Sequence, residues 1–197
     1  MEARALLVAA VASVAVFLLV SADLKAAGPY AADLLEFGGC DDGEYRGMTI
    51  NVSLVLDEET NETTHRGDIT VFYDVFADEN EVEVIAFKWG STGGWSQIYY
   101  LNYTKPYEFT KTNFPLVFDL LFVEMGMDKQ PVTPGVYHIH RFMPRRVTLE
   151  KFVAFPYGKF KLYAKGLKDG ERLSCLQALA SVYEVENSQG VGVKPAF

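Results

Sequence analysis

Histidines have the clearest potential for chemistry in this 197-residue chain, which contains three of them. His138 and His140 are two positions apart, so on a strand both side chains would point to the same side and, with a third ligand, could bind zinc. No cysteine or further histidine stands near them to complete a ligand set, which favours two surface histidines on an edge strand. His65 is expected to be solvated in a turn over residues 61–67. We therefore predict no metal site.

Motifs of known catalytic sites are missing from the sequence. Gly90-Ser91-Thr92-Gly93 lacks the Gly-x-Ser-x-Gly spacing of a nucleophile elbow and is interpreted as a turn. Acidic clusters at 41–44 and 57–59 do not match the calcium-binding loop and are interpreted as solvated turns. A glycosidase-type pair of carboxylates stays open as an alternative, because acidic residues are numerous. The prediction is a protein that is not an enzyme and uses no cofactor.

The N-terminus predicts the compartment. A short start with one basic residue, Met1–Arg4, precedes an apolar run, Ala5–Val20, and the small residues Ser21 and Ala22. This order is typical of a secretory signal peptide, with cleavage expected after Ala22. An uncleaved anchor is the alternative, but the run is shorter than the roughly 20 apolar residues of a spanning helix. The mature protein is expected outside the cell or in the lysosomal lumen.

Sequons and cysteines agree with a secretory compartment. Glycosylation is expected at three asparagines, each followed two positions on by Ser or Thr: Asn51, Asn61 and Asn102. Cys40 and Cys175 form an even count, which makes a disulfide the default in an oxidising compartment, with two buried free thiols as the alternative. Closing so long a loop would stabilise the fold by about 5 kcal/mol on the chain-entropy model.

Composition and charge narrow the classes of partner. Without the signal peptide about 175 residues remain, enough for one domain with one core. The chain has 14 Phe and 11 Tyr, which favours strands or an aromatic-lined cavity. The formal net charge is −8 and no basic stripe is present, so nucleic acid is not expected as a partner.

Alternating apolar residues predict a mainly β fold. Met48–Leu56 has a period of two, and further β-branched and aromatic runs are separated by turn residues. Strands are expected over residues 48–56, 69–77, 81–89, 95–103, 135–140, 158–165 and 173–185. The strands over 69–77 and 81–89 are expected to form a hairpin, and Lys168-Asp169-Gly170 is expected as the turn of the last hairpin. Short strands at regular spacing suggest a two-sheet β-sandwich or cup.

One segment has helical spacing instead. Its apolar residues are Phe114, Val117, Phe118, Leu121, Phe122 and Met125, with Pro115 suited to the first turn and Gly126 to the end. One short helix over 115–125 with so few charges must pack on a core or line a cavity. An ordinary aromatic core and a hollow core that holds an acyl chain are both open at this point.

Three runs in the C-terminal half form a recognisable pattern: Gly135-Val136-Tyr137-His138-Ile139, Tyr157-Gly158-Lys159-Phe160-Lys161-Leu162, and Asp169-Gly170-Glu171-Arg172-Leu173-Ser174-Cys175-Leu176. Together with Cys40-Asp41-Asp42-Gly43 near the start, they resemble the ganglioside activator protein family, sphingolipid activators related to other lipid-recognition proteins. The resemblance covers about residues 38 to 185. One departure is that this chain keeps only the outermost cysteine pair and lacks the family's further disulfides at the cavity mouth.

The resemblance implies a β-cup with an apolar cavity that holds lipid tails, in which Cys40 pairs with Cys175. The expected organisation is a signal peptide at 1–22, an N-terminal lead at 23–37, a lipid-binding domain at 38–186 and a flexible tail at 187–197. Cavity or rim contacts are expected from apolar and aromatic residues, namely Trp89, Phe114, Val117, Phe118, Leu121, Phe122, Phe155 and Phe160. The expected partners are a glycolipid, phospholipid or fatty acyl ligand, a membrane in transient contact, and a protein such as a hydrolase or receptor.

Two other classes of function are weighed against lipid transfer. A secreted, chemosensory-type module would bind a small hydrophobic signal, and a hydrolase would turn over a substrate. Cargo distinguishes the first, because a lipid carrier should purify with a phospholipid or sphingolipid. Loss of turnover on changing one polar residue would reveal the second.

Overall fold

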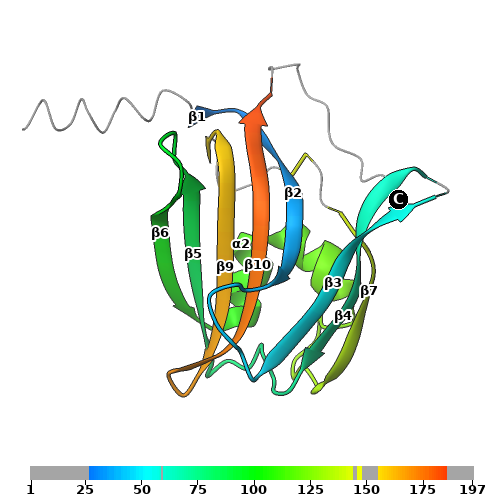
Figure 1. Cartoon of the computed structure of the whole chain (residues 1–197). Coiled ribbons are helices and arrows are strands. Elements are labelled where there is room, and N and C mark those ends of the chain that lie inside the picture. The colour runs from blue at the N-terminus through cyan, green and yellow to red at the C-terminus, as the bar shows by residue number, and fades with distance from the viewer. Residues whose placement is uncertain (1–26, 59, 144–145, 148–154, 186–197) are drawn as a thin grey trace, which may run out of the picture.

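The computed structural model describes residues 27–58, 60–143, 146–147 and 155–185, which form two main antiparallel sheets, a short two-stranded pair of β1 with β8, and a helical segment (Figure 1). The expected signal peptide at 1–22 and tail at 187–197 lie outside these residues. The strands are β1 (Ala27–Gly28), β2 (Tyr30–Gly39), β3 (Met48–Asp57), β4 (Glu62–Val71), β5 (Glu81–Trp89), β6 (Trp95–Thr104), β7 (Gly135–Phe142), β8 (Phe155–Pro156), β9 (Gly158–Lys168) and β10 (Glu171–Glu184). The prediction of a mainly β, two-sheet sandwich or cup is confirmed.

The larger sheet has five strands in the order β2-β10-β9-β5-β6. Two hairpins build its centre and one edge. β9 and β10 turn at Asp169 and Gly170, which both have positive φ, so the predicted final hairpin is confirmed. β5 and β6 join through 90–94, as the glycines there indicated.

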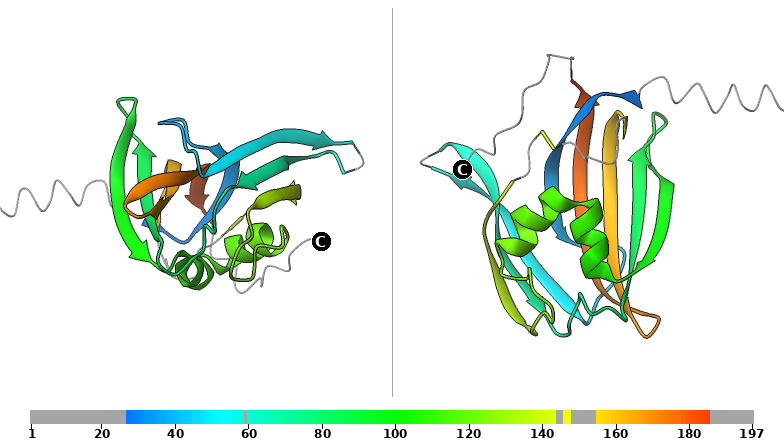
Figure 2. Two further views of the ribbon diagram at one scale, coloured as in Figure 1. Left: turned by 90° about the horizontal axis from the view of Figure 1, so that it is seen from below. Right: turned by 180° about the vertical axis from the view of Figure 1, so that it is seen from behind.

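The smaller sheet has the order β3-β4-β7. β3 leaves the larger sheet near the end of β2, where a Cβ on Gly39 would lie 3.9 Å from Ile50 Cβ, and then diverges from it (Figure 1). The two sheets are therefore joined along one side and splay apart on the other (Figure 2).

The predicted strand over 69–77 is wrong in its bounds and its pairing. β4 runs from Glu62 to Val71 and pairs with β3 and β7, whereas β5 belongs to the other sheet. A turn was predicted over residues 61–67, most of which belong to β4. The neighbours of this segment in space, rather than its own composition, make it a strand.

The N-terminal lead expected at 23–37 contains, in its described part, the short strand β1 and most of the edge strand β2. β2 pairs with β10 from Tyr30 to Gly39, with a bulge at Leu179 and Ala180. Asp33 and Glu36 interrupt the apolar alternation, which is why the pattern did not indicate a strand.

The helical segment begins earlier than predicted and consists of three pieces: α2 (Pro106–Asn113), α3 (Pro115–Val117) and the π-helix η2 (Phe118–Val123). The predicted apolar helix over 115–125 is confirmed in place, and α2 is an addition to it. Figure 2 (right) shows the segment lying across the space between the two sheets, on the side opposite the junction of β2 and β3.

The main core lies between the smaller sheet and the helices. Its fully buried members come from β4, η2 and the loop after η2: Ile69, Val71, Phe118, Leu121 and Met127. A second cluster, formed by Tyr30, Phe160 and Val182, lies on the larger sheet.

Candidate functional site

The strand register defines which residues share a face of the larger sheet, because directly paired residues point to the same side. One row consists of Val84, Ala164 and Leu176, and the next consists of Ala86, Leu162, Ala178 and Phe37. Leu101 on β6 continues the first row. Phe37 and Leu176 pack against the core that the other sheet shares, so these rows face inward. We refer to this side as the concave face.

The centre of the concave face is apolar but incompletely covered. Six of its side chains are half-buried rather than buried: Val84, Leu101, Leu162, Ala164, Leu176 and Ala178. On the opposite, outer face the alternating residues Glu83, Ile85, Tyr163, Lys165 and Cys175 are buried. Apolar side chains on an inward face normally have the lower exposure. An apolar surface therefore remains accessible on the inner side of this sheet.

The helical segment is anchored at both ends of the space that it crosses. Phe109 of α2 stacks on Tyr103 of β6 at 4.3 Å between ring centroids. At the other end, Phe122 packs edge-on against Phe76 at 5.0 Å. The exposed large apolar side chains of the segment are Leu116 and Val123, which are 39% and 42% exposed.

The predicted lipid-contacting residues fall into separate groups. Phe118, Leu121 and Phe122 are buried in the main core. Phe155 and Phe160 lie together, with ring centroids 5.1 Å apart, beside Tyr30 in the second cluster. The others are Phe114, which contacts Phe109, Val117, which is half-buried, and Trp89.

Trp89 lies away from the concave face. It pairs with Trp95 at the end of the β5–β6 hairpin, with ring centroids 5.2 Å apart. Lys161, whose row on the outer face includes Phe87, places its ammonium 5.3 Å from the Trp95 ring. The pair therefore belongs to the outer side, and the sequence-based selection of inward-facing strand residues missed Leu162, Ala178 and Leu101 instead. A correct register for β5, β9 and β10 would have identified them.

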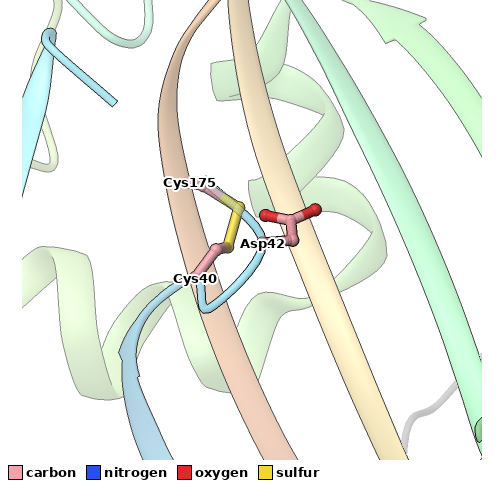
Figure 3. Close-up of side chains that lie close together, drawn as sticks. All are labelled: Cys40, Asp42 and Cys175. Atoms are coloured by element: carbon pink, nitrogen blue, oxygen red, sulfur yellow. A yellow bond between two sulfur atoms is a disulfide. The ribbon is translucent and has the colours of Figure 1, made fainter. Parts of the chain in front are cut away.

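The disulfide lies on the outer face and confirms the predicted pairing. Cys40 and Cys175 are bonded, with Cα atoms 5.6 Å apart, and Asp42 lies beside them (Figure 3). These three residues form the one group of metal-ligating residue types found in the described part of the chain. Both sulfur atoms are used in the disulfide, so the group lacks the thiolates that bind metals.

An ionic cluster covers the outer face around the disulfide. It is formed by Asp41, Asp42, Lys161, Tyr163 and Lys165, and we refer to it as the outer cluster. Lys161 donates to Asp41 at 2.8 Å, Tyr163 also donates to Asp41, and Lys165 donates to Asp42. The Lys165 side chain is only 7% exposed, so its charge depends on this partner.

These contacts shift the protonation of both carboxyls. Hydrogen bonds from Lys161 and then Tyr163 lower the pKa of Asp41. For Asp42, burial raises the pKa, but the hydrogen bonds from Lys165 and Tyr45 outweigh it, so the pKa is lowered. Burial, followed by the bond to Asp41, raises the pKa of Tyr163. The cluster therefore stays ionised well into the acidic range.

A second ion pair extends the polar side of the sheet. Arg172 donates from Nε to Glu83 at 2.7 Å and from Nη2 at 3.1 Å, and Tyr100 donates to the same carboxylate at 2.8 Å. The hydrogen bond from Arg172 lowers the pKa of Glu83, which is buried. This pairing satisfies a charge that the fold has removed from water.

The surface histidines match their prediction. His138 and His140 are exposed on β7, an edge strand, with ring centroids 6.3 Å apart. Asp68 on β4 contacts His138 Nδ1 at 2.6 Å.

His65 corrects the prediction of a solvated turn. It lies in β4, only 2% exposed, and its Nδ1 is 3.0 Å from the carbonyl oxygen of Phe142. Its ring also approaches Phe37 of the other sheet at 6.3 Å, edge-on. Nε2 is buried without a hydrogen-bond partner among the described residues. Burial lowers the pKa of His65, so a neutral imidazole lies where the two sheets meet.

An open groove of about 590 Å³ adjoins the disulfide. Its lining is mixed, with Tyr45, Arg46, Met48 and Ile50 beside Glu171 and Arg172. Arg46 and Glu171 are paired across it. Because these charges already satisfy one another, the groove offers less for a ligand than the concave face does.

No family model matches the chain, and the search of curated proteins found no match. Within the described residues, no helix combines the length and apolar character needed to cross a bilayer.

Proposed function

We propose that this protein is a secreted or lysosomal lipid-binding and lipid-transfer protein, which holds acyl chains against the concave face. The observation that carries the proposal is the inverted exposure of the larger sheet. Six apolar side chains of its inner rows are only half-buried, although Ala86 is buried there, while the charged residues Glu83 and Lys165 of its outer rows are buried. An apolar surface that the fold leaves accessible is available for an apolar ligand.

The chemistry of the concave face fits acyl chains. Leu, Val and Ala side chains offer dispersion contacts without a fixed polar pattern, and each buried methylene of a ligand contributes roughly 0.8 kcal/mol. Small residues, Ala164 and Ala178, lie at the centre, where a large side chain would fill the space. Binding would then depend on chain length more than on a particular headgroup.

The helical segment is the proposed rim. Leu116 and Val123 are its exposed apolar side chains, so they replace the buried Phe118, Leu121 and Phe122 as the proposed points of transient membrane contact. Charges at those three core positions would test folding rather than lipid contact. The resemblance to the ganglioside activator protein family supports the same function, and a hydrolase or receptor partner remains part of the proposal.

Two concave-face variants test the proposal. Ala178→Phe should reduce uptake of a fluorescent C16 fatty acid, because the added ring occupies the ligand's space, while leaving the urea midpoint nearly unchanged. Leu162→Asp should reduce uptake further by placing a carboxylate there. Val136→Asp is the matched control, since Val136 is 54% exposed on β7. Unchanged uptake in both concave-face variants, with the folded state confirmed by circular dichroism, would contradict the proposal.

Native mass spectrometry of the secreted protein then identifies the cargo. A phospholipid or sphingolipid that is retained by the wild type and lost in Ala178→Phe supports lipid transfer. A small volatile or hydrocarbon cargo supports the chemosensory-type alternative instead. Protein that stays empty after incubation with phosphatidylcholine and ganglioside vesicles would contradict lipid transfer.

A further inference from the structure

Four long strands lie at the edges of the two sheets, and they differ in how their edges are protected. β2 and β6 bound the larger sheet, and β3 and β7 bound the smaller one. An edge strand exposes unpaired backbone N–H and C=O groups, to which a strand of a second molecule can bind. Natural proteins commonly protect such edges with charged side chains or with a covering segment.

Two of the edges are protected by charge. β2 carries Asp33 and Glu36, and its backbone also pairs at Ala32 with Val147, through N–O distances of 2.9 and 2.8 Å. β7 carries Arg141 together with its two exposed histidines.

The other two edges carry no Asp, Glu, Lys or Arg apart from Asp57 at the end of β3. β6 has ten residues and none is Asp, Glu, Lys or Arg, and β3 has none from Met48 to Leu56. β6 is also apolar, since Ile98 is 48% exposed and Tyr99, Tyr100 and Tyr103 are exposed as well. A long, uncharged, aromatic edge strand is a site for pairing with a second copy of the chain.

Each of these two uncharged edges carries a sequon in mid-strand. Asn51 lies in β3 and Asn102 in β6, and both side chains are exposed. The charged edges β2 and β7 carry none, and the third sequon, at Asn61, lies in the turn between β3 and β4. We propose that N-glycans on Asn51 and Asn102 protect the uncharged edges of β3 and β6 from pairing with a second copy of this chain.

The local geometry of Asn102 permits this modification. Its Nδ2 donates to Glu81 Oε2 at 2.7 Å. In glycan transfer the amide nitrogen loses one proton and bonds to C1 of the sugar, while the C1–oxygen bond to the lipid diphosphate carrier breaks and the diphosphate leaves. One N–H remains, so the contact with Glu81 is retained. Asn102 is paired with Glu83, so the glycan emerges on the outer face of the edge strand β6, and its bulk hinders the approach of another strand.

Thr104, the third residue of the Asn102 sequon, allows a matched pair of variants for the test. Thr104→Ala removes the sequon and keeps Asn102, whereas Thr104→Ser keeps the sequon with a similar change of side chain. Asn61→Gln removes the turn glycan and serves as the second control. The full-length chain is expressed in a eukaryotic secretory host, its glycan occupancy is measured by intact mass, and its oligomeric state by size exclusion with light scattering.

The expected result is a glycosylated, monomeric wild type and a Thr104→Ala protein that loses its monomer peak to dimers or larger species. Thr104→Ser and Asn61→Gln should stay monomeric, and Ile98→Lys added to Thr104→Ala should restore the monomer by placing a charge on the edge. An unoccupied Asn102 in secreted wild type, or a Thr104→Ala protein as monomeric as Thr104→Ser, overturns the proposal.

If Thr104→Ala is not secreted, folded wild type carrying oligomannose glycans is trimmed with an endoglycosidase that leaves one sugar. An amidase is unsuitable, because it converts Asn102 to aspartate and so charges the edge. Self-association of the trimmed protein supports the proposal, and a trimmed protein that stays monomeric overturns it.

Discussion

The outer and concave faces of the five-stranded sheet differ in what they bury. The outer face is polar and closed, because the segment after Cys40 covers it and ties Asp41 and Asp42 to lysines of β9. The concave face is apolar, and most of its central residues are only half-buried. The charges that this sheet buries, on Glu83 and Lys165, thus lie on the side turned away from the other sheet. Contacts on the outer face can therefore hold the sheet together while part of the inner surface stays accessible.

The largest expected effect tests the closure of the outer face. Changing both cysteines, in Cys40→Ser with Cys175→Ser, should lower the free energy of unfolding by about 5 kcal/mol, because the bond closes a loop of 135 residues. Urea unfolding of the double variant and the wild type measures the difference. A loss below about 1 kcal/mol would mean that the covering segment is held by its ion pairs instead.

A pair of truncations compares the two faces directly. Ile85→Ala on the outer face should cost about 3 kcal/mol, because Ile85 is only 9% exposed and packs against Tyr163 and Cys175. Leu162→Ala on the concave face should cost about 1 kcal/mol, because part of that side chain already contacts solvent. Equal costs in urea unfolding would show that the concave face is packed in solution.

The outer cluster predicts an asymmetry between ion-pair partners. Asp42→Asn should cost about 2 kcal/mol, because it leaves the buried ammonium of Lys165 without its counter-charge. Lys165→Met should cost about 1 kcal/mol or less, because the carboxylate of Asp42 is 35% exposed and can be rehydrated. The reverse order of urea midpoints would show that the ammonium is accessible to water.

Much of the fold was predictable where local pattern and structure coincide. The period of two in Met48–Leu56, the turn at Asp169-Gly170 and the apolar helix after Pro115 each encode their own element. β2 and β4 were missed because their charged and polar residues are balanced by neighbours distant in sequence, as Arg141 of β7 balances Glu62 of β4. Such balance is invisible to a local pattern.

The sequence predicted the apolar character of the candidate site but not the residues that form it. Apolar bulk indicated a surface for lipid, but the residues on it depend on which strands pair and in what register. The core residue Phe118 and the half-exposed Leu162 have similar apolar character in sequence, and only their positions in the fold separate them. The burial of His65 likewise depends on the fold, because the rings of Phe37 from β2 and Phe142 from β7 contact each other and the imidazole.

The smallest expected effect is a difference in pH dependence between the outer cluster and the sheet junction at His65. Lowered carboxyl pKa values at Asp41, Asp42 and Glu83 contribute stability that is present above the unfolded pKa of about 4 and is lost as pH falls through the folded values. The pKa of His65 is also lowered, by burial, although Phe142 and Glu36 oppose this shift. The unfolded chain therefore takes up a proton first below about pH 6.5, and stability falls from there toward the folded pKa.

The two pH windows separate the regions, because the contribution of His65 begins to fall below about pH 6.5, whereas that of the carboxyls begins to fall only below about pH 4. Few charged residues surround the imidazole. His65 is paired with Leu54 of β3 and with Phe142 of β7. Arg141, which precedes Phe142, forms an ion pair with Glu62. One proton limits the slope to about 1.4 kcal/mol per pH unit. Urea midpoints at pH 7, 6 and 5 should decline in the wild type and stay nearly level in His65→Gln. A parallel decline in both proteins would place the pH-sensitive group elsewhere than His65.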